Sequence, residues 1–222
     1  MTDLSAPMTL EAPADNAAAQ RTDEWRKARS GKWTGSTMMD IVARNKKTGE
    51  KLASFDARVW KVVTERLTGQ PEEGVSSFSL QWGTDLEPYA LERYEIETGN
   101  VVTQTGFVQH PKYSFVGASA DGLIGLDGCL EAKCPKNSSI HLERFLSGVP
   151  EDYRAQIQTE IWVCERDWCD FVSFDPRQTE KFQMLRIRVN RDDQFIKRIE
   201  ESVLMAEEAA CSLIERLEKV VR

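Results

Sequence analysis

Histidine and closely spaced cysteine are nearly absent from this 222-residue sequence. The two histidines, His110 and His141, are isolated, and none of the five cysteines forms a Cys-x-x-Cys pair. Zinc sites and Ser/His/Asp or Cys/His catalytic sites need such residues in combination, so these classes are disfavoured. We expect both histidines to be structural or exposed, and the cysteines to be free thiols in a reducing cytoplasm.

Long apolar runs are also missing. No segment approaches the roughly 18 to 20 apolar residues that a membrane helix needs, which indicates a soluble protein without a membrane partner. Residues 1–19 are rich in alanine and lack the basic and apolar regions of a targeting peptide, so we predict a flexible N-terminal tail. Residues 20–222 are long enough to form a single domain with a sizeable core.

The sequence also has no excess of positively charged residues. The formal net charge is −7, which argues against a protein that binds nucleic acid over its whole surface. Acidic residues concentrate in segments 85–97 and 200–218, whereas segments 21–32 and 133–136 are basic or mixed. This asymmetry is compatible with a local basic channel on a negative exterior, or simply with a solvated surface of mixed charge.

Two carboxylates and an amine are the most informative residues present: Asp121, Glu131 and Lys133. Side chains alternate faces along a strand, so Glu131 and Lys133 share one face while Leu130 and Ala132 take the other and pack into the core. Between Asp121 and Glu131 lie turn-forming residues, of which Asp127-Gly128 gives the strongest hairpin signal. The hairpin returns Glu131 to Asp121, close enough for both to bind one cation.

This set of groups fits the hydrolysis of a phosphodiester. Two carboxylates with water and a substrate phosphate suit Mg²⁺, which prefers hard oxygen ligands and retains much of its water. Lys133 can orient the attacking water and help to deprotonate it if its surroundings lower its pKa. From these residues alone, a surface hairpin with an ordinary Glu/Lys face remains an alternative.

The flanking sequence favours the functional interpretation. An Asp followed about ten residues later by Glu-x-Lys-Cys-Pro resembles the PD-(D/E)XK nuclease pattern, with Ala120 where the pattern has proline. Over about 155 residues the chain resembles the family of bacteriophage lambda exonuclease, the YqaJ-like viral recombinase nucleases, with seven segments in the family's order. The segments are Asp23-Glu-Trp-Arg-Lys-Ala-Arg-Ser-Gly31, Thr34-Gly-Ser36, Trp82-Gly-Thr-Asp-Leu-Glu-Pro88, Ser119-Ala-Asp-Gly-Leu123, Leu130-Glu-Ala-Lys-Cys-Pro135, Ala155-Gln-Ile-Gln-Thr-Glu-Ile-Trp-Val163 and Phe174-Asp-Pro176.

The resemblance implies further members of a catalytic site. It adds Glu87 and the backbone carbonyl of Ala132 to Asp121 and Glu131 as metal ligands, and implies two Mg²⁺ or Mn²⁺ ions per site. It also assigns a catalytic role to Gln156. Gln156 and Gln158 are two apart on a predicted helix and face different directions, so only one of them can reach the site. Either glutamine, like Glu87, could instead be an ordinary structural or surface residue.

A second implied site binds the 5′ end of DNA. The resemblance makes Trp25 a wedge at the end of the duplex and Arg29 a ligand of the terminal 5′ phosphate, with Thr34, Gly35 and Ser36 beside it. Trp25 and Arg29 are four apart and neighbours on one helix face. Ser36 is predicted to begin the next helix, whose free N–H groups favour an anion. Trp25 as a core residue and Ser36 as a plain N-cap are the alternatives.

The pattern of elements predicts an α/β fold with a mixed central β-sheet flanked by helices, and the resemblance makes this a restriction-endonuclease-like PD-(D/E)XK core. Thr22, Ser54, Gly69 and Gly99 are read as helix ends. Predicted helices cover 22–30, 36 onward, 54–69, 79–98, 140–146, 153–164 and 193–220. Predicted strands cover 101–109, 113–118, 123–126, 129–133, 168–175 and 184–189.

Function follows mainly from the resemblance. It implies a metal-dependent 5′→3′ exonuclease that degrades one strand of linear double-stranded DNA and leaves 3′ overhangs for recombination by strand annealing. It further implies a ring-shaped homotrimer, a single-strand-annealing partner protein, and a phage or prophage gene expressed in bacterial cytoplasm. The alternatives are another PD-(D/E)XK nuclease, either an endonuclease or an iron–sulfur exonuclease, and a non-catalytic module that binds DNA ends. Because Cys211 stands alone near the C-terminus, the iron–sulfur alternative is the weaker nuclease hypothesis.

Overall fold

The structure, a computed structural model, describes residues 20–72 and 78–221; the predicted tail, 1–19, lies outside the described residues. Its centre is a five-stranded sheet in the order β2-β5-β6-β7-β8. Only β6 and β7 are parallel, so the sheet is mixed as predicted. The strands are β2 (Val102–Thr103), β5 (Gly122–Ile124), β6 (Gly128–Lys133), β7 (Trp168–Phe174) and β8 (Met184–Asn190).

A smaller sheet of β1 (Trp33–Thr34), β4 (Val116–Ala118) and β3 (Val108–Gln109) lies beside it. The prediction of one strand over 101–109 is wrong, because β2 pairs with β5 in the large sheet and β3 with β4 in the small one. Residues 104–107 cross between the two sheets. The prediction of a strand over 113–118 is too long, because the Val116 N–H donates to the Tyr113 carbonyl in a turn.

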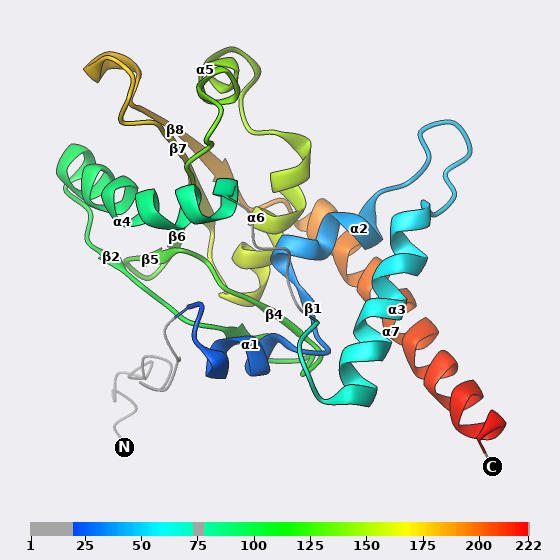
Figure 1. The fold of residues 1–222 in the computed structure, drawn as a ribbon. Coiled ribbons are helices and arrows are strands. Elements are labelled where there is room, and N and C mark those ends of the chain that lie inside the picture. Colours follow the sequence, from blue (N-terminus) through cyan, green and yellow to red (C-terminus); the bar gives the residue numbers. More distant parts are fainter. Residues whose placement is uncertain (1–19, 73–77, 222) are drawn as a thin grey trace, which may run out of the picture.

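Helices cover both faces of the central sheet (Figure 1). On one face lies α4 (Phe78–Thr98), whose buried side chains pack on Leu130, Ala132 and Val172. On the other lies α6 (Glu151–Val163), joined by α2 (Met38–Val42), α3 (Ala53–Thr68) and α7 (Asp193–Val220) around a larger core. The alternation along β6 is therefore as predicted: Leu130 and Ala132 face α4, and Cys129 belongs to the core with α6.

Most of the predicted helix ends agree with the structure. The Thr22 hydroxyl accepts from the Trp25 N–H and caps α1 (Asp23–Arg29), and Gly69, with a positive φ of 66°, ends α3. The expected cap at Ser54 is wrong, because α3 begins after Leu52 and the Ser54 hydroxyl donates to the Asp40 carbonyl at 2.9 Å. A serine oxygen bound to a distant carbonyl holds α3 against α2 instead of capping it.

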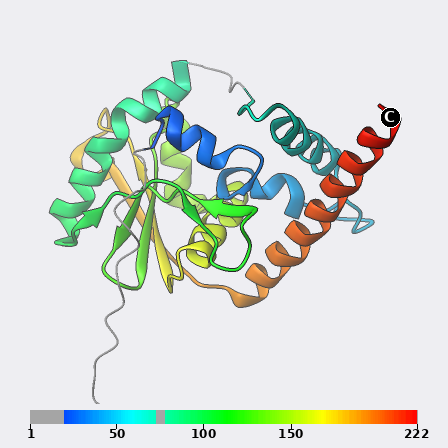
Figure 2. The same ribbon diagram turned by 90° about the horizontal axis from the view of Figure 1, so that it is seen from below.

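Three further features complete the outline. Asn137 caps α5 (Ser138–Ser147), which begins two residues before the prediction. The long α7 lies against α3 and extends beyond the body of the protein, as Figure 2 also shows. Within the described ranges, no helix combines the length and apolar character needed to cross a membrane.

Candidate active site

The β5–β6 hairpin brings Asp121 beside the strand that carries Glu131. The Asp121 N–H donates to the Leu130 carbonyl at 3.1 Å, and the Ala132 N–H donates to Asp121 Oδ2 at 2.8 Å. The first bond holds the Asp121 backbone and the second holds its carboxylate, beside the two residues that flank Glu131 in β6. The separation of ten residues in sequence becomes direct proximity, as the pattern predicted.

The turn itself differs in detail from the prediction. Gly128 already lies in β6 and pairs with Ile124, so the turn consists of residues 125–127. Gly125 has the positive φ, 55°, that the turn requires. Gly128 is needed for a different reason: a Cβ there would lie 2.3 Å from the Trp168 ring, which closes over the strand.

Glu131 is the most deeply buried member of the cluster, with 1% of its surface exposed. Its carboxylate forms an ion pair with Lys133 and accepts from Gln156 Nε2 on Oε1 at 2.7 Å. Its second oxygen, Oε2, is buried and has no hydrogen-bond partner. A buried carboxylate oxygen without a donor is costly, so the site is incomplete as a purely protein structure.

The pKa shifts of Asp121 and Lys133 indicate that negative charge is in excess at this site. Burial is the main cause that raises the pKa of Asp121 well above its usual value, and the nearby Glu131 and Glu87 carboxylates add to the rise. Burial on its own lowers the pKa of Lys133, but the Glu131 and Asp121 carboxylates outweigh it and raise that pKa above normal. The lysine therefore holds its proton among these carboxylates. A bound cation is what would relieve the repulsion between the acids.

The donor set suits a hard divalent cation with open coordination positions. Among residues 20–72 and 78–221, no three His, Cys, Asp or Glu side chains converge as a closed metal site. The Asp121 carboxylate nevertheless contacts the backbone of Ala132, which lines a cavity of about 520 Å³ with Lys133, and the neighbouring Glu131 has one buried oxygen without a partner. Few protein ligands and room for water are typical of Mg²⁺ sites.

Glu87, the predicted third ligand, stands at the edge of this region. It lies on α4, lines the same cavity and contributes to the raised pKa of Asp121. Its carboxylate forms an ion pair with Arg21, whose side chain is 42% exposed. Glu87 is therefore close to the acidic pair but already has a cationic partner.

Gln156, and not Gln158, reaches the cluster. Gln158 Nε2 donates to the Asn190 carbonyl at 2.8 Å, and Gln158 Oε1 accepts from the Asp192 N–H at 2.9 Å, so its amide holds the start of α7. Gln156 Nε2 instead donates both to Glu131 and, at 2.9 Å, to Glu160 Oε1. Their different directions follow from the helical spacing.

Glu160 was missed by the sequence reasoning. It is 1% exposed, its Oε2 lacks a partner, and burial together with Glu131 raises its pKa well above normal. The available signal was its position four residues after Gln156, on the same face of α6. Glu160 holds the Gln156 amide in place and adds a third buried acid to the neighbourhood.

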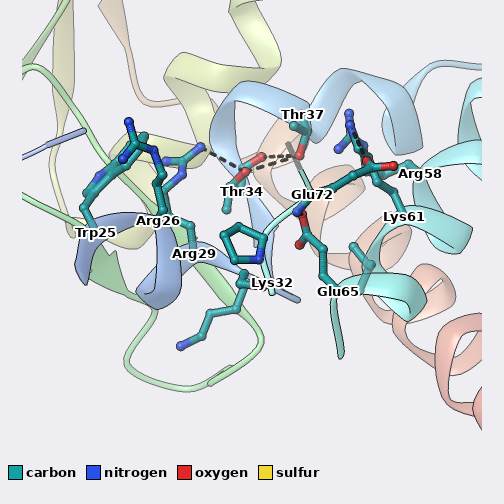
Figure 3. A pocket seen from close by; sticks show the side chains of 13 residues that line it. Trp25, Arg26, Arg29, Lys32, Thr34, Thr37, Arg58, Lys61, Glu65 and Glu72 are labelled. Carbon is teal, nitrogen blue, oxygen red and sulfur yellow. Dashed lines mark hydrogen bonds and ion pairs between the residues drawn. The ribbon is translucent and has the colours of Figure 1, made fainter. Parts of the chain in front are cut away.

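Arg29 forms a second cluster with hydroxyl groups (Figure 3). Its Nη1 donates to Ser119 Oγ at 3.1 Å, and its Nη2 donates to Ser36 Oγ at 3.0 Å and to Thr34 Oγ1 at 3.4 Å. The guanidinium lies 4.3 Å from the centre of the Trp25 ring. No carboxylate in the described ranges forms an ion pair with it, and burial lowers the pKa of Arg29 to about 10.

A half-buried guanidinium that contacts neutral hydroxyls is a favourable place for an anion. Ser119, whose role the sequence motif does not indicate, also accepts from Trp25 Nε1 at 3.0 Å. Its position two residues before Asp121 was the signal that the two clusters adjoin. A cavity of about 580 Å³ opens beside Arg29, Trp25 and Thr34, as Figure 3 shows.

The helix predicted to begin at Ser36 begins one residue earlier, as a 3-10 turn, and Ser36 is not its N-cap. Residues Gly35–Thr37 form a short 3-10 helix with Thr34 at its N-cap, followed by the five-residue α2. The Ser36 hydroxyl accepts from Arg29 instead. Gly35 packs on α6, where an added Cβ would lie 3.4 Å from the Gln156 carbonyl. This contact joins the arginine cluster to the acidic cluster.

The remaining polar candidates are structural. His110 Nδ1 accepts from the Lys112 N–H at 3.0 Å, and the His141 ring lies between Ser173 Oγ and the Phe182 carbonyl. All five cysteines are free thiols, as expected. The buried ones are Cys129, Cys134 and Cys169, Cys164 is partly buried and Cys211 is exposed.

A mixed sheet between helical layers, with Asp121 and Glu131 at a hairpin and Lys133 beside them, defines a PD-(D/E)XK-like nuclease fold. The YqaJ-like viral recombinase domain matches residues 24–167, which is more than half of the chain. The protein therefore belongs to the YqaJ-like viral recombinase family. This family assignment agrees with the resemblance found in the sequence.

Solved structures support the assignment. LHK-Exo, an alkaline exonuclease from Laribacter hongkongensis, was solved in complex with dAMP; it is 39% identical, with 90% of this chain and 98% of that chain covered and a TM-score of 0.83. A second LHK-Exo structure gives 38% identity with the same coverage and a TM-score of 0.82. A phage-related exonuclease from Haemophilus somnus, 17% identical over 84% of this chain and 96% of its own with a TM-score of 0.65, shares the fold.

A viral relative is more distant. An uncharacterized protein, R354, of Acanthamoeba polyphaga mimivirus is 26% identical over 169 residues. The match covers 69% of this chain but only 28% of the mimivirus protein. This chain therefore spans less than a third of that relative's length.

Proposed function

We propose that the protein is a metal-dependent 5′→3′ exonuclease that degrades one strand of linear double-stranded DNA and leaves 3′ single-stranded overhangs. One observation carries the proposal: a buried pair of acids with an unsatisfied oxygen adjoins Lys133, and a half-buried arginine that forms no ion pair with a carboxylate of the described residues lies nearby. The first group suits a cation and a reacting phosphate. The second suits the phosphate at the end of the degraded strand.

Asp121, Glu131 and the Ala132 carbonyl would hold Mg²⁺ or Mn²⁺. The bound ion supplies Lewis acidity and a water acidic enough to attack a phosphodiester. Lys133 lines the same cavity, where its ammonium group can orient that water by donating a hydrogen bond to it. Its pKa is raised in the protein alone, so Lys133 would accept a proton from the water only once a bound cation lowers that pKa. Gln156 holds Glu131 by donating to Oε1, which leaves Oε2 available as a ligand.

Glu87 would serve a second ion. In the protein alone its carboxylate pairs with Arg21, so a second ion needs that pair to open. Arg21 is partly exposed and can swing into solvent at small cost, because exposed ion pairs contribute little. The side chains already gathered around Glu131 therefore fit one ion, and a second binds only as Arg21 moves away.

Arg29, Ser36, Thr34 and Ser119 would bind the terminal 5′ phosphate. A guanidinium can grip a phosphate through two parallel charge-assisted hydrogen bonds, while the hydroxyls donate further ones. Trp25 lies over Arg29 and would stack at the end of the duplex. Since Gly35 packs against Gln156, the terminal phosphate and the scissile phosphate would sit on adjoining parts of one site.

The biological setting is proposed from the family. The chain would act as a homotrimer with a single-strand-annealing recombinase as partner, and would be encoded by a phage or prophage in a bacterial cytoplasm. LHK-Exo, similar over 90% of this chain, is an alkaline exonuclease that binds dAMP, which supports a DNA substrate and mononucleotide products.

Digestion of linear duplex DNA labelled at either 5′ or 3′ ends tests this function. With Mg²⁺ or Mn²⁺ and 5′-phosphorylated ends, we expect release of labelled mononucleotides from the 5′ end, retention of the 3′ label on long strands, and loss of activity with EDTA. Cleavage of closed circular DNA would indicate an endonuclease instead. Retention of intact DNA in every metal, together with end binding, would indicate a non-catalytic module.

A further inference from the structure

A buried arginine, Arg144 of α5, lines the same cavity as Lys133 and Glu87. Only 4% of Arg144 is exposed, and the cavity has a volume of about 520 Å³. Neither the sequence motifs nor the family match gives it a role. It lies on a different helix from Arg29, and in Figure 1 α5 and α1 stand on opposite sides of β6.

The contacts of Arg144 do not balance its charge. Nη1 donates to Ser173 Oγ at 2.9 Å, Nη2 reaches Tyr153 Oη only at 3.5 Å, and the buried Nε has no hydrogen-bond partner. The guanidinium also lies 5.4 Å and 5.6 Å from the ring centres of Tyr153 and Phe171. Neutral hydroxyls and rings stabilise a guanidinium less than a carboxylate does.

Several other arginines in the described structure are paired with a carboxylate. Arg66 binds both oxygens of Glu207, and Arg188 binds both oxygens of Asp170. Arg144 has no such partner within the described ranges, and burial lowers its pKa. A cation kept in a cavity wall without a counterion is suited to an anion that arrives with the substrate.

The position of Arg144 indicates which anion. The Tyr153 ring contacts both cations, with its centre 5.1 Å from Lys133 Nζ and 5.4 Å from the Arg144 guanidinium. Arg144 is therefore a second positive group close to Lys133 in the wall of this cavity, which Arg21 and Lys136 also line. A strand whose 5′ phosphate lies at Arg29 and whose first internal phosphate lies at the acidic pair would bring its next phosphate to this wall.

We infer that Arg144 binds the backbone phosphate one nucleotide to the 3′ side of the scissile bond and so holds the strand in register for cleavage. The inference rests on the proposed exonuclease function. A guanidinium is suited to this role because its planar donors match the oxygens of a phosphate.

A neutral phosphate analogue tests the contact without altering the protein. A 5′-phosphorylated duplex would carry a methylphosphonate at the phosphate immediately 3′ of the first scissile bond, and single-turnover release of the first nucleotide would be measured. Loss of a charge-assisted hydrogen bond is expected to slow the wild-type enzyme by roughly tenfold or more. A methylphosphonate ten nucleotides further along serves as the substrate control.

Arg144→Met and Arg144→Lys complete the test. On unmodified DNA, Arg144→Met should be slowed about as much as the wild type is by the analogue, and the analogue should slow it no further. Arg144→Lys should retain part of the sensitivity because it keeps the charge. Arg29→Met is the matched protein control, since it should remain sensitive to the methylphosphonate while losing its preference for 5′-phosphorylated ends.

Two results would overturn the inference while leaving the proposed function standing. One is a wild-type enzyme that cleaves the methylphosphonate and the unmodified duplex at equal rates. The other is a folded Arg144→Met enzyme, judged by thermal melting, that the analogue still slows as strongly as it slows the wild type. If wild-type protein releases no nucleotide with either metal, the proposed function fails, and the inference fails with it.

Discussion

Lys133 is the residue whose removal most directly separates chemistry from binding. Its side chain lines the 520 Å³ cavity, pairs with Glu131 and remains 26% exposed. We expect Lys133→Ala to leave the fold and DNA affinity intact but to lower the single-turnover cleavage rate by roughly two orders of magnitude, the scale for loss of a positioned acid/base group. Fluorescence anisotropy with labelled duplex and thermal melting provide the controls. A cleavage rate close to that of the wild type would refute the assigned role.

Arg29 gives the sharpest test of direction. If its guanidinium binds the terminal phosphate, Arg29→Ala should reduce rate and processivity chiefly on 5′-phosphorylated ends. The advantage of such ends over 5′-hydroxyl ends, expected at roughly tenfold for a charge-assisted contact, should shrink toward none. Parallel digestion of the two substrates by wild type and variant measures this ratio.

Arg26 offers a matched control for that experiment. It lies on the same helix and lines the same 580 Å³ cavity, but it pairs with Asp23 on the surface. Arg26→Ala should leave the ratio between the two ends unchanged. Equal weakening of both substrates by Arg29→Ala would make Arg29 a general backbone contact.

The site residues that the sequence identified are specified by local patterns, whereas those that it missed are specified by packing between distant segments. Asp121, Glu131 and Lys133 were recognisable because strand alternation and one hairpin bring them together within thirteen positions of the chain. Glu160, Ser119 and Arg144 were not. Their significance depends on which partners burial gives or denies them, and this is decided by packing between distant segments.

At the scale of elements, a short link holds the chain that leaves β6. Asp175, directly after β7, accepts from Arg177 Nε at 2.7 Å and from the Ser138 hydroxyl at the start of α5. Arg177 Nη2 in turn donates to the Lys136 carbonyl at 2.8 Å. The Phe174-Asp-Pro176 motif thus has a physical role, because it anchors the segment that follows Lys133.

This link predicts a pH-dependent contribution to stability. Burial raises the pKa of Asp175, but hydrogen bonds from Arg177 and Ser138 outweigh it and lower that pKa to about 2. The ionised form is therefore favoured by folding. Its stabilising effect is complete above the unfolded pKa of about 3.9 and is lost as pH falls through about 2.

Urea unfolding of wild type and Asp175→Asn measures the effect. The difference in unfolding free energy at pH 7 should be about 1 to 2 kcal/mol, below the full linkage value because the partly exposed Arg177 is screened by water. It should decline steadily as the pH is lowered from 4 toward 2. A difference that stays constant over this interval would show that the substitution acts through packing and not through charge.

Sequence located elements better than it located their connections. The cap at Thr22, the glycine stop at Gly69 and the whole of α7 were foreseeable, because each depends on local propensity or periodicity. The division of 101–109 between two sheets was not. A β-branched run predicts extended backbone, but the choice of pairing partner is made by β5 and β4, which lie later in the chain.

At the scale of the whole molecule, charge and assembly must be considered together. A net charge of −7 means that a single subunit attracts duplex DNA poorly overall, although Arg29 and Arg144 provide local positive positions. A ring that encloses DNA stays on it without a generally basic surface. The proposed homotrimer would therefore reconcile an acidic protein with processive degradation.

The trimer makes a prediction that can be tested on the intact protein. Light scattering should report a mass of about three times 25.2 kDa, and single-round digestion with excess trap DNA should still degrade long substrates. Attraction to phosphates weakens steeply with salt, because each contact releases counterions. An enclosed duplex should instead remain bound, so the length degraded per encounter should change little when salt is raised after loading. Covalently closed circular DNA, which has no end to enter the ring, serves as the negative substrate. A strictly monomeric particle at working concentration, or a processive length that falls with salt as steeply as the initial binding does, would rule out the ring.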